Sequence, residues 1–304
     1  MTVLGASVPV SRLVLGYPDL TGQAGRYALA TLAFAAIWWC VGAGPGKARG
    51  PRERSERIKQ SVRLSGRDWV RLTALAATGL VGFNMLLLTA LRHADPAVVG
   101  TIVGGTPLAL ALLGPLQRRQ RPASRLVMAA GVVIAGGALV HGGGSADGVG
   151  LAAAFGTLAG EVLFSLLAVP LLPRLGPLRV SALSCALAVP MLGVALVVAG
   201  EPARWRLPTA GETLGYAYLG GLLTVIAFLV WYGGLARLGP ERAGLFVGLL
   251  PAVSLATTAL IDRDPPAVVQ VVGVLLVAAG LATGLYAPRQ DQARSDSAAL
   301  ASAR

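Results

Sequence analysis

Charged residues are scarce in this chain of 304 residues. Only 13% of the residues are Asp, Glu, Lys or Arg, whereas 55% are hydrophobic, and the mean hydropathy is +0.68. A soluble domain of this length needs considerably more charge to cover its surface. The composition therefore excludes an ordinary soluble protein and favours a membrane protein.

Residues that carry reactive chemistry are also few. Cys40 and Cys185 lie far apart inside apolar segments, so we expect buried free thiols rather than a disulfide or a redox pair. His93 and His141 have no metal-ligand spacing, and the sequence contains no nucleotide-binding loop, nucleophile elbow or pair of carboxylates. The sequence therefore predicts neither an enzyme nor a metal or cofactor site.

Long apolar segments are what the chain has in abundance. A helix needs roughly 20 apolar residues to cross a bilayer. Nine segments of about that length carry at most one charge, and a tenth, residues 1–17, is apolar except for Arg12. The nine segments are 27–44, 72–91, 96–116, 126–141, 149–173, 180–200, 213–236, 243–261 and 265–288. They predict an all-α membrane protein with ten transmembrane helices, the first of them truncated because it is short for a ~30 Å hydrocarbon core.

The basic residues are distributed unevenly over the predicted loops. If the loops alternate sides, 20 of the 26 Lys and Arg residues fall on one side, nine of them between residues 47 and 71. Five fall on the other side, and Arg12 lies inside the first segment. The positive-inside rule then makes the basic side cytoplasmic, with both termini there, in the cell membrane. A net charge of +12 that is spread over such loops argues against nucleic-acid binding.

The chain contains an internal repeat. Residues 91–107, LRHADPAVVGTIVGGTP, align without a gap with residues 235–251, LARLGPERAGLFVGLLP. The repeat predicts a first unit at 1–144 with a basic loop at 45–68, a second unit at 148–288, and a disordered cytoplasmic tail at 289–304. An odd number of five helices per unit would insert the second unit upside down, as in many secondary transporters.

Both copies of the repeat contain a GxxxG pair followed by a proline. GxxxG lets a neighbouring helix approach closely, and a proline in mid-membrane removes a hydrogen bond and bends the helix. The exposed carbonyls then line a cavity, or the bends serve packing alone; the pattern leaves both interpretations open. The residues concerned are Gly100, Gly104 and Pro107 in the first copy, and Gly244, Gly248 and Pro251 in the second.

A family resemblance follows from these features. The paired units, the turns ALRHADPA and GLARLGPERAG, and the prolines within the spans resemble the EamA domain of the drug/metabolite transporter superfamily. The resemblance extends over residues 1–288. It implies ten helices, a central cavity between the halves, and transport of small metabolites, often outward.

Polar residues inside the apolar segments are the candidate site. Glu161 is the only acid within a span, and an unpaired carboxylate there is costly. It is expected to bind a cationic substrate or carry a coupling proton, or else to pair with an arginine such as Arg12, which could instead bind a substrate carboxylate. Asn84 and Tyr232 could bind substrate, although interhelical contact for Asn84 and membrane-surface anchoring for Tyr232 are alternatives. Arg26 is expected to be an interface anchor.

The sequence thus predicts a secondary transporter that exports a small metabolite, amino acid or drug-like molecule by alternating access, with proton coupling as an option. A non-transporting membrane scaffold or sensor is the alternative. The expected partners are the lipid bilayer and a small molecule, not nucleic acid, and assembly as a homodimer stays open.

Overall fold

The computed structural model describes residues 16–42, 64–250, 252–253, 255–256 and 267–285. Within these ranges the chain is helical, apart from one isolated β-bridge between Ala94 and Ala146. Seven helices in the described part are long and apolar enough to cross a membrane. The prediction of an all-α membrane protein is therefore confirmed. The ten-helix count and the inverted repeat stay predictions, because residues 1–15 and part of the segment 243–261 lie outside the described residues.

The chain forms two compact units. Unit 1 is built from residues up to Val103 and from Gly144–Pro240, and unit 2 from Gly104–Gly143 and the residues from Glu241 onward. Each unit takes segments from both predicted repeats. The two compact units therefore do not coincide with the two predicted repeats. The division of the repeats at 144–148 stays a prediction from sequence.

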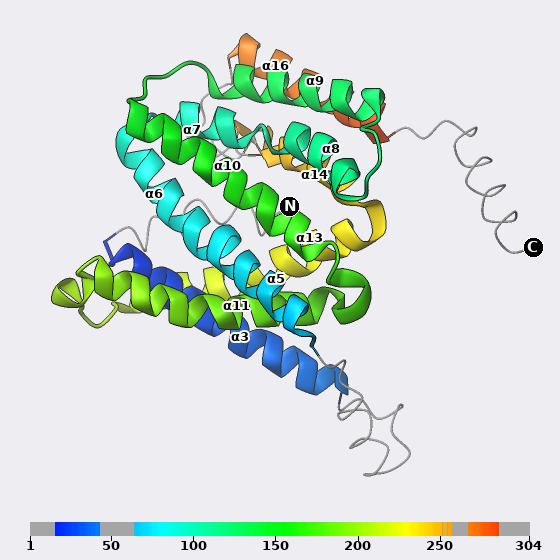
Figure 1. Ribbon diagram of the computed structural model, residues 1–304. Coiled ribbons are helices and arrows are strands. Elements are labelled where there is room, and N and C mark those ends of the chain that lie inside the picture. The colour runs from blue at the N-terminus through cyan, green and yellow to red at the C-terminus, as the bar shows by residue number, and fades with distance from the viewer. Residues whose placement is uncertain (1–15, 43–63, 251, 254, 257–266, 286–304) are drawn as a thin grey trace, which may run out of the picture. The chain divides into compact units, whose positions relative to one another are not determined.

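Unit 1 holds most of the long helices. Its elements are α3 (Asp19–Gly42), α5 (Gly66–Leu75), η1 (Ala76–Gly82), α6 (Phe83–His93), α7 (Pro96–Val103), α10 (Gly148–Ala168), α11 (Leu172–Val198), η2 (Glu201–Arg204), α12 (Ala210–Tyr216), η3 (Ala217–Thr224) and α13 (Val225–Leu238). Helix α3 packs along α11, and α6 packs along α10 (Figure 1). Their contacts bury one face of each helix and leave large apolar side chains on the outside, as expected for helices in lipid.

Unit 2 contains α8 (Thr106–Gln117), α9 (Ser124–His141), α14 (Pro240–Leu245), η4 (Phe246–Gly248) and α16 (Val268–Leu285). Helices α9 and α16 lie side by side (Figure 1). A Cβ atom added to Gly136 would lie 2.5 Å from the carbonyl oxygen of Gly273. The two backbones are therefore in direct contact, which only small residues allow.

Two long spans of unit 1 begin alike and are interrupted alike. We call residues 66–93 the first interrupted span and residues 210–238 the second. Each starts with a capping box, Ser65 with Asp68 and Thr209 with Glu212, in which hydroxyl and carboxylate bond each other's backbone N–H groups. Each then changes from α-helix to π-helix, in η1 and η3. The two boxes are 144 residues apart, which is the offset of the sequence repeat.

The span that contains Pro107 is broken rather than bent. Helix α7 ends at Val103, and α8 starts at Thr106 with Pro107 in its first turn. Proline has no N–H, and its ring would collide with the carbonyl of Val103, four residues earlier, so the helix stops between them. In the second copy α14 gives way to the 3₁₀ turn η4, which ends at Gly248. Pro251 lies outside the described residues.

Three expectations about single residues need correction. Cys185 is buried as expected, but Cys40 is exposed in the last turn of α3, where an apolar thiol can face lipid. Tyr232 is fully buried instead of anchoring the helix at a membrane surface. Arg26 does not lie at the start of its helix, because α3 already begins at Asp19.

Candidate functional site

The predicted site residues fall in both units. Glu161 lies on α10, Asn84 on α6 and Tyr232 on α13, all in unit 1. Gly100 lies in α7, and Gly104 lies at the break that follows it. In unit 2, Gly244 lies against Leu110 and Gly248 against Val133, so neither glycine has room for a side chain. Arg12, like Pro251, is outside the described residues.

Asn84 joins two helices of unit 1. Its side-chain nitrogen donates one hydrogen bond to the hydroxyl of Tyr27 on α3, at 3.0 Å, and another to the carbonyl of Leu80 in η1, at 2.6 Å. Both Asn84 and Tyr27 are buried. The structure thus shows the interhelical contact, whereas contact of Asn84 with a substrate stays a prediction.

Tyr232 lies in a group of aromatic rings. Its ring centroid is 5.0 Å from that of Phe164 on α10 and 6.0 Å from that of Phe228, one turn earlier on α13. Its hydroxyl is buried without a hydrogen bond to the described residues, although the Ser184 hydroxyl of α11 lies near it, as does Tyr27. We call Tyr27, Asn84, Phe164, Phe228 and Tyr232 the aromatic–amide cluster.

Glu161 lies beside this cluster on α10. It precedes Phe164 by three residues, which places the two side chains on neighbouring positions of one helix face. A Cβ at Gly160 would lie 2.9 Å from the carbonyl oxygen of Thr78, and one at Gly79 would lie 2.6 Å from Cβ of Phe164. Helix α10 therefore packs with its backbone against η1, and this contact brings Glu161 next to the π-helical part of the first interrupted span.

Arg26 occupies a comparable place beside the second interrupted span. Its Nε donates to the hydroxyl of Thr224 at 2.8 Å, and its guanidinium lies 5.8 Å from the ring centroid of Tyr27. A Cβ at Gly220 would lie 2.6 Å from the carbonyl oxygen of Arg26, so α3 and η3 are also in backbone contact. This position of Arg26 is not evident from the sequence, because the polar residues before Tyr27 resemble a loop. Extending the predicted helix back to Asp19 would have placed Arg26 inside it.

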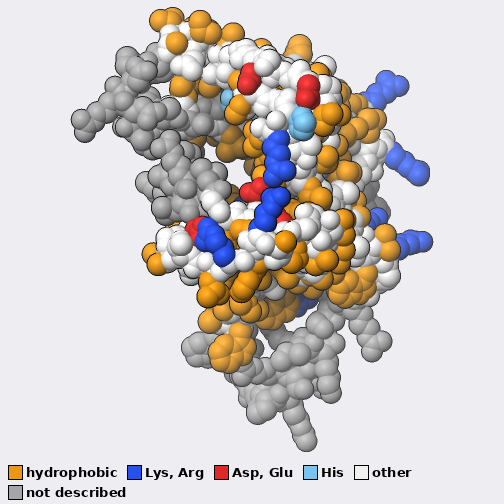
Figure 2. All heavy atoms as spheres, turned by 90° about the vertical axis from the view of Figure 1, so that its left-hand side faces the viewer, with side chains coloured by type: hydrophobic (Ala, Val, Ile, Leu, Met, Phe, Trp, Pro, Cys, Tyr) orange, Lys and Arg blue, Asp and Glu red, His pale blue; other side chains and the backbone are white. Residues whose placement is uncertain are grey.

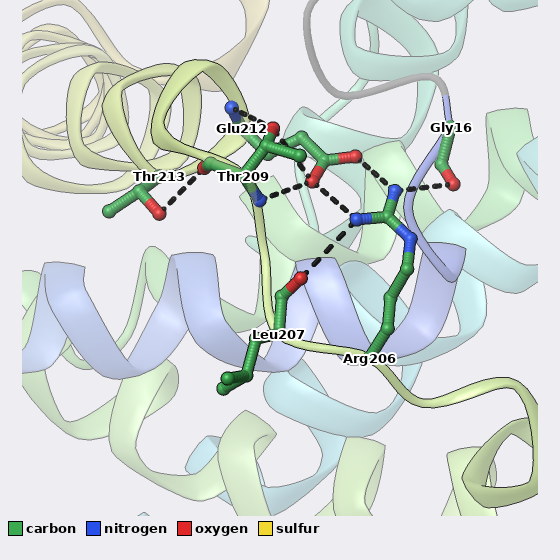
Figure 3. Close-up of polar contacts among 6 residues, drawn as sticks. All are labelled: Gly16, Arg206, Leu207, Thr209, Glu212 and Thr213. Atoms are coloured by element: carbon green, nitrogen blue, oxygen red, sulfur yellow. Dashed lines mark hydrogen bonds and ion pairs between the residues drawn. The ribbon is translucent and has the colours of Figure 1, made fainter.

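Ion pairs at the ends of the helices serve a different purpose. Arg206 donates to both carboxylate oxygens of Glu212 and to the carbonyl of Gly16, and Glu212 also accepts from the backbone N–H and the hydroxyl of Thr209 (Figure 3). The hydrogen bond and charge of Glu212 raise the pKa of Arg206. On one face of the molecule, acidic side chains lie directly beside basic and histidine side chains, surrounded by hydrophobic ones (Figure 2). Such paired groups hold helix ends together.

The described residues contain no group of three or more His, Cys, Asp and Glu side chains that could hold a metal ion. What they bring together is a set of aromatic, amide and hydroxyl groups between α3, α6, α10, α11 and α13, with Glu161 and Arg26 beside it. Apolar helices of spanning length around polar interior groups define a multi-pass helical membrane protein.

Comparison with known proteins identifies the class more closely. Residues 148–285 match the EamA-like transporter family. The uncharacterized transporter YdeK of Bacillus subtilis (strain 168) is 31% identical over 218 residues, which cover 71% of this chain and 74% of the relative. The uncharacterized transporter YetK of the same organism is 21% identical over 305 residues, covering 96% and 86% of the two chains. The chain therefore belongs to the EamA-like transporter family, which confirms the resemblance inferred from its turns and glycines.

A solved structure supports the fold independently. One crystal structure matches 93% of this chain and 94% of its own chain, with a TM-score of 0.74 at 19% sequence identity. At that identity the match shows the fold alone. The family and the relatives, with the apolar helices of the described residues, make this protein a multi-pass membrane transporter.

Proposed function

We propose that the protein is a secondary transporter that exports a small metabolite, amino acid or drug-like molecule across the cell membrane. Ten helices in two inverted repeats would alternate access to a site near the middle of the membrane. The observation that carries this proposal is the aromatic–amide cluster, with Glu161 next to it, in the interior of unit 1. Polar and ionisable groups at such a depth are costly and mark the paths of substrates and ions.

Glu161 is the residue proposed to couple transport to protons or to bind a cationic group of the substrate. It follows a glycine that packs against η1, and π-helical segments inside helices are often found at functional sites. Rearrangement of η1 would change the surroundings of the carboxylate and so its affinity for a proton. Asn84, Tyr232 and Arg12 are the other proposed substrate or coupling residues.

The proposed division of the loops between two sides of the membrane has support from the ion pairs, whereas the choice of the cytoplasmic side rests on the positive-inside rule. Each of the five pairs between described residues joins segments that the sequence assigns to one side of the membrane. Arg174 and Asp68, for example, both belong to the predicted cytoplasmic side, whereas Arg92 and Asp19 both belong to the opposite side.

The test is a metabolite profile of cells and medium. Cells that lack the gene are compared with cells that overproduce the wild-type protein or the Glu161→Gln variant at equal membrane levels. At least one metabolite should move from the cells to the medium with the wild-type protein, and less so with the variant. If no metabolite differs between the deletion strain and the overproducing strain, the scaffold or sensor alternative replaces the proposal.

A further inference from the structure

Arg26 differs from the ion-paired arginines of unit 1 in its position within a helix. It lies seven residues after Asp19, about 10 Å along the axis of α3, and its side chain is half-buried. The arginines of unit 1 that form ion pairs with described residues lie at helix ends or in loops, where Arg92 binds Asp19, Arg174 binds Asp68 and Arg206 binds Glu212. Among the described residues, no carboxylate forms an ion pair with Arg26.

The hydrogen bonds of Arg26 leave most of its donors unused. A guanidinium carries five N–H groups. Only Nε–H donates to a described residue, the neutral hydroxyl of Thr224, which in turn donates to the carbonyl of Leu219. The contact between Gly220 and the Arg26 carbonyl holds α3 against η3 at this point. Arg26 is therefore fixed in position, while its two terminal nitrogens donate no hydrogen bond to the residues that the structure describes.

The groups around Arg26 suit an anion with an apolar body. The ring of Tyr27 lies under the guanidinium. Cys185 of α11 is close enough to interact electrostatically with Arg26, Tyr27 and the Tyr232 hydroxyl. The Tyr232 hydroxyl and the side-chain oxygen of Gln23, one turn before Arg26, are both buried without a hydrogen bond to the described part of the chain. Among the described residues, Arg26 thus has no counter-ion, and its neighbourhood contains aromatic rings and the Tyr232 hydroxyl, which can donate a hydrogen bond to an anion.

We propose that Arg26 binds a carboxylate of the transported molecule, and that the substrate class is a small organic anion with an apolar or aromatic body. The terminal nitrogens present two parallel N–H groups, which match the two oxygens of a carboxylate. The bound anion would supply the counter-charge that a buried guanidinium requires. This inference rests on the proposed transport function but concerns binding, which is measured separately.

The experiment measures binding of three probes of equal size to the purified protein in detergent. They are 3-phenylpropionate, its neutral amide and the cation 3-phenylpropylamine, followed by tryptophan fluorescence and by the shift in melting temperature. The anion should bind most tightly. Arg26→Gln should weaken the binding of the anion by roughly ten- to a hundredfold, to the affinity of the amide. This is the loss expected when charge-assisted hydrogen bonds are removed. Arg26→Lys should retain part of the difference.

Arg92→Gln is the matched control, because it removes an arginine with an exposed ion pair. It should leave anion binding unchanged. Equal loss in both variants, equal affinity of the wild-type protein for anion and amide, or no saturable anion binding would each overturn the inference. If Arg26→Gln does not fold, the comparison of the three probes on the wild-type protein decides alone.

The outcome is separable from that of the proposed function. Continued metabolite export by a protein that does not distinguish the anion from the amide would overturn the role of Arg26 and leave the transporter proposal in place. Selective anion binding without any export would support Arg26 as an anion site and contradict the export proposal.

Discussion

The first and second interrupted spans share a framework but differ in the side chains that it holds. Both begin with a capping box and contain a π-helical segment that receives another helix in backbone contact. The first span receives α10 and with it Glu161, whereas the second receives α3 and with it Arg26. Asn84 of the first span is replaced, 144 residues later, by Phe228. The same backbone arrangement is thus associated with an acid and an amide at the first span, and with a base and an aromatic ring at the second span.

The junctions that follow the two spans differ as well. In the first, Asp95 accepts hydrogen bonds from the backbone N–H and hydroxyl of Ser145, and His93 contacts the carboxylate of Asp147. In the second, the matching position is Gly239, with a φ of 78° that favours glycine. The first junction therefore combines side-chain hydrogen bonds with the backbone bridge of Ala94 and Ala146, whereas the second turns at a glycine. The following predictions test how far the resemblance between the two halves extends.

The largest effect concerns orientation. If the halves are inverted copies, cytoplasmic reporters fused after Gly50, Arg121 and Arg289 should be active, and those fused after Gly144 and Thr209 inactive. The expected difference is all or none, because a reporter lies on one side or the other. A cytoplasmic signal after Gly144 would break the comparison, since the first half would no longer contain an odd number of spans.

The second effect is loss of coupling at Glu161. Glu161→Gln should abolish pH-dependent transport while the amount of folded protein stays close to the wild-type amount, and Glu161→Asp should retain part of the activity. If Glu161 serves a structural pair with Arg12 instead, Glu161→Gln should lower the folded amount and Arg12→Gln should restore part of it. Transport assays at several pH values, with membrane levels measured in parallel, separate the two cases.

The third effect tests the backbone contact at η3 with two adjacent glycines. An added Cβ at Gly220 would lie 2.6 Å from the Arg26 carbonyl oxygen, whereas at Gly221 it would meet nothing within 4 Å. Gly220→Ala should therefore destabilise the protein by about 1–3 kcal/mol, and Gly221→Ala should not. Thermal unfolding in detergent measures both, and equal melting temperatures for the two variants would mean that η3 and α3 are not in contact.

The fourth effect tests the difference between Asn84 and Phe228. Tyr27→Phe should cost about 1 kcal/mol, and Asn84→Leu should cost more because it also removes the hydrogen bond to Leu80; the double variant should cost less than the sum of the two, because either change removes the bond between the two side chains. Met85→Leu is the matched control, since Met85 is the next residue but is exposed. Additive costs in the double variant would show that the bond does not contribute.

The smallest effect concerns pH at the first junction. The N–H of Gly150, followed by His93, holds the pKa of Asp147 below its ordinary value. A carboxylate with a lowered pKa contributes stability above its unfolded pKa of about 4, and the contribution disappears as the pH falls through the folded value. Asp147→Asn should therefore lower the melting temperature at pH 6, with a difference that shrinks below about pH 4. A difference that stays constant down to pH 3 would contradict the role of the charge.

Part of the site was predictable because a polar residue in an apolar segment is visible in sequence. Glu161 and Asn84 were identified in this way, and the structure places them on α10 and α6 of unit 1. Phe164 and Phe228 could not be identified, since nothing in the sequence separates these rings from the other apolar residues of their helices. Arg26 was misjudged because the first turn of α3 is held by Glu201, from a segment far along the chain, which accepts hydrogen bonds from the N–H groups of Leu20 and Thr21.

The sequence by itself determined the class of protein, the position of most helices and the alignment of residues 91–107 with residues 235–251 at an offset of 144 residues. It could do so because a bilayer acts on each segment separately, through its length, its hydropathy and the charges at its ends. Only the tertiary structure decided which side chains meet. Asn84 reaches Tyr27 across 57 residues and Arg26 reaches Thr224 across 198. Such contacts depend on how each helix is rotated and packed against its neighbours, and no single segment contains that information.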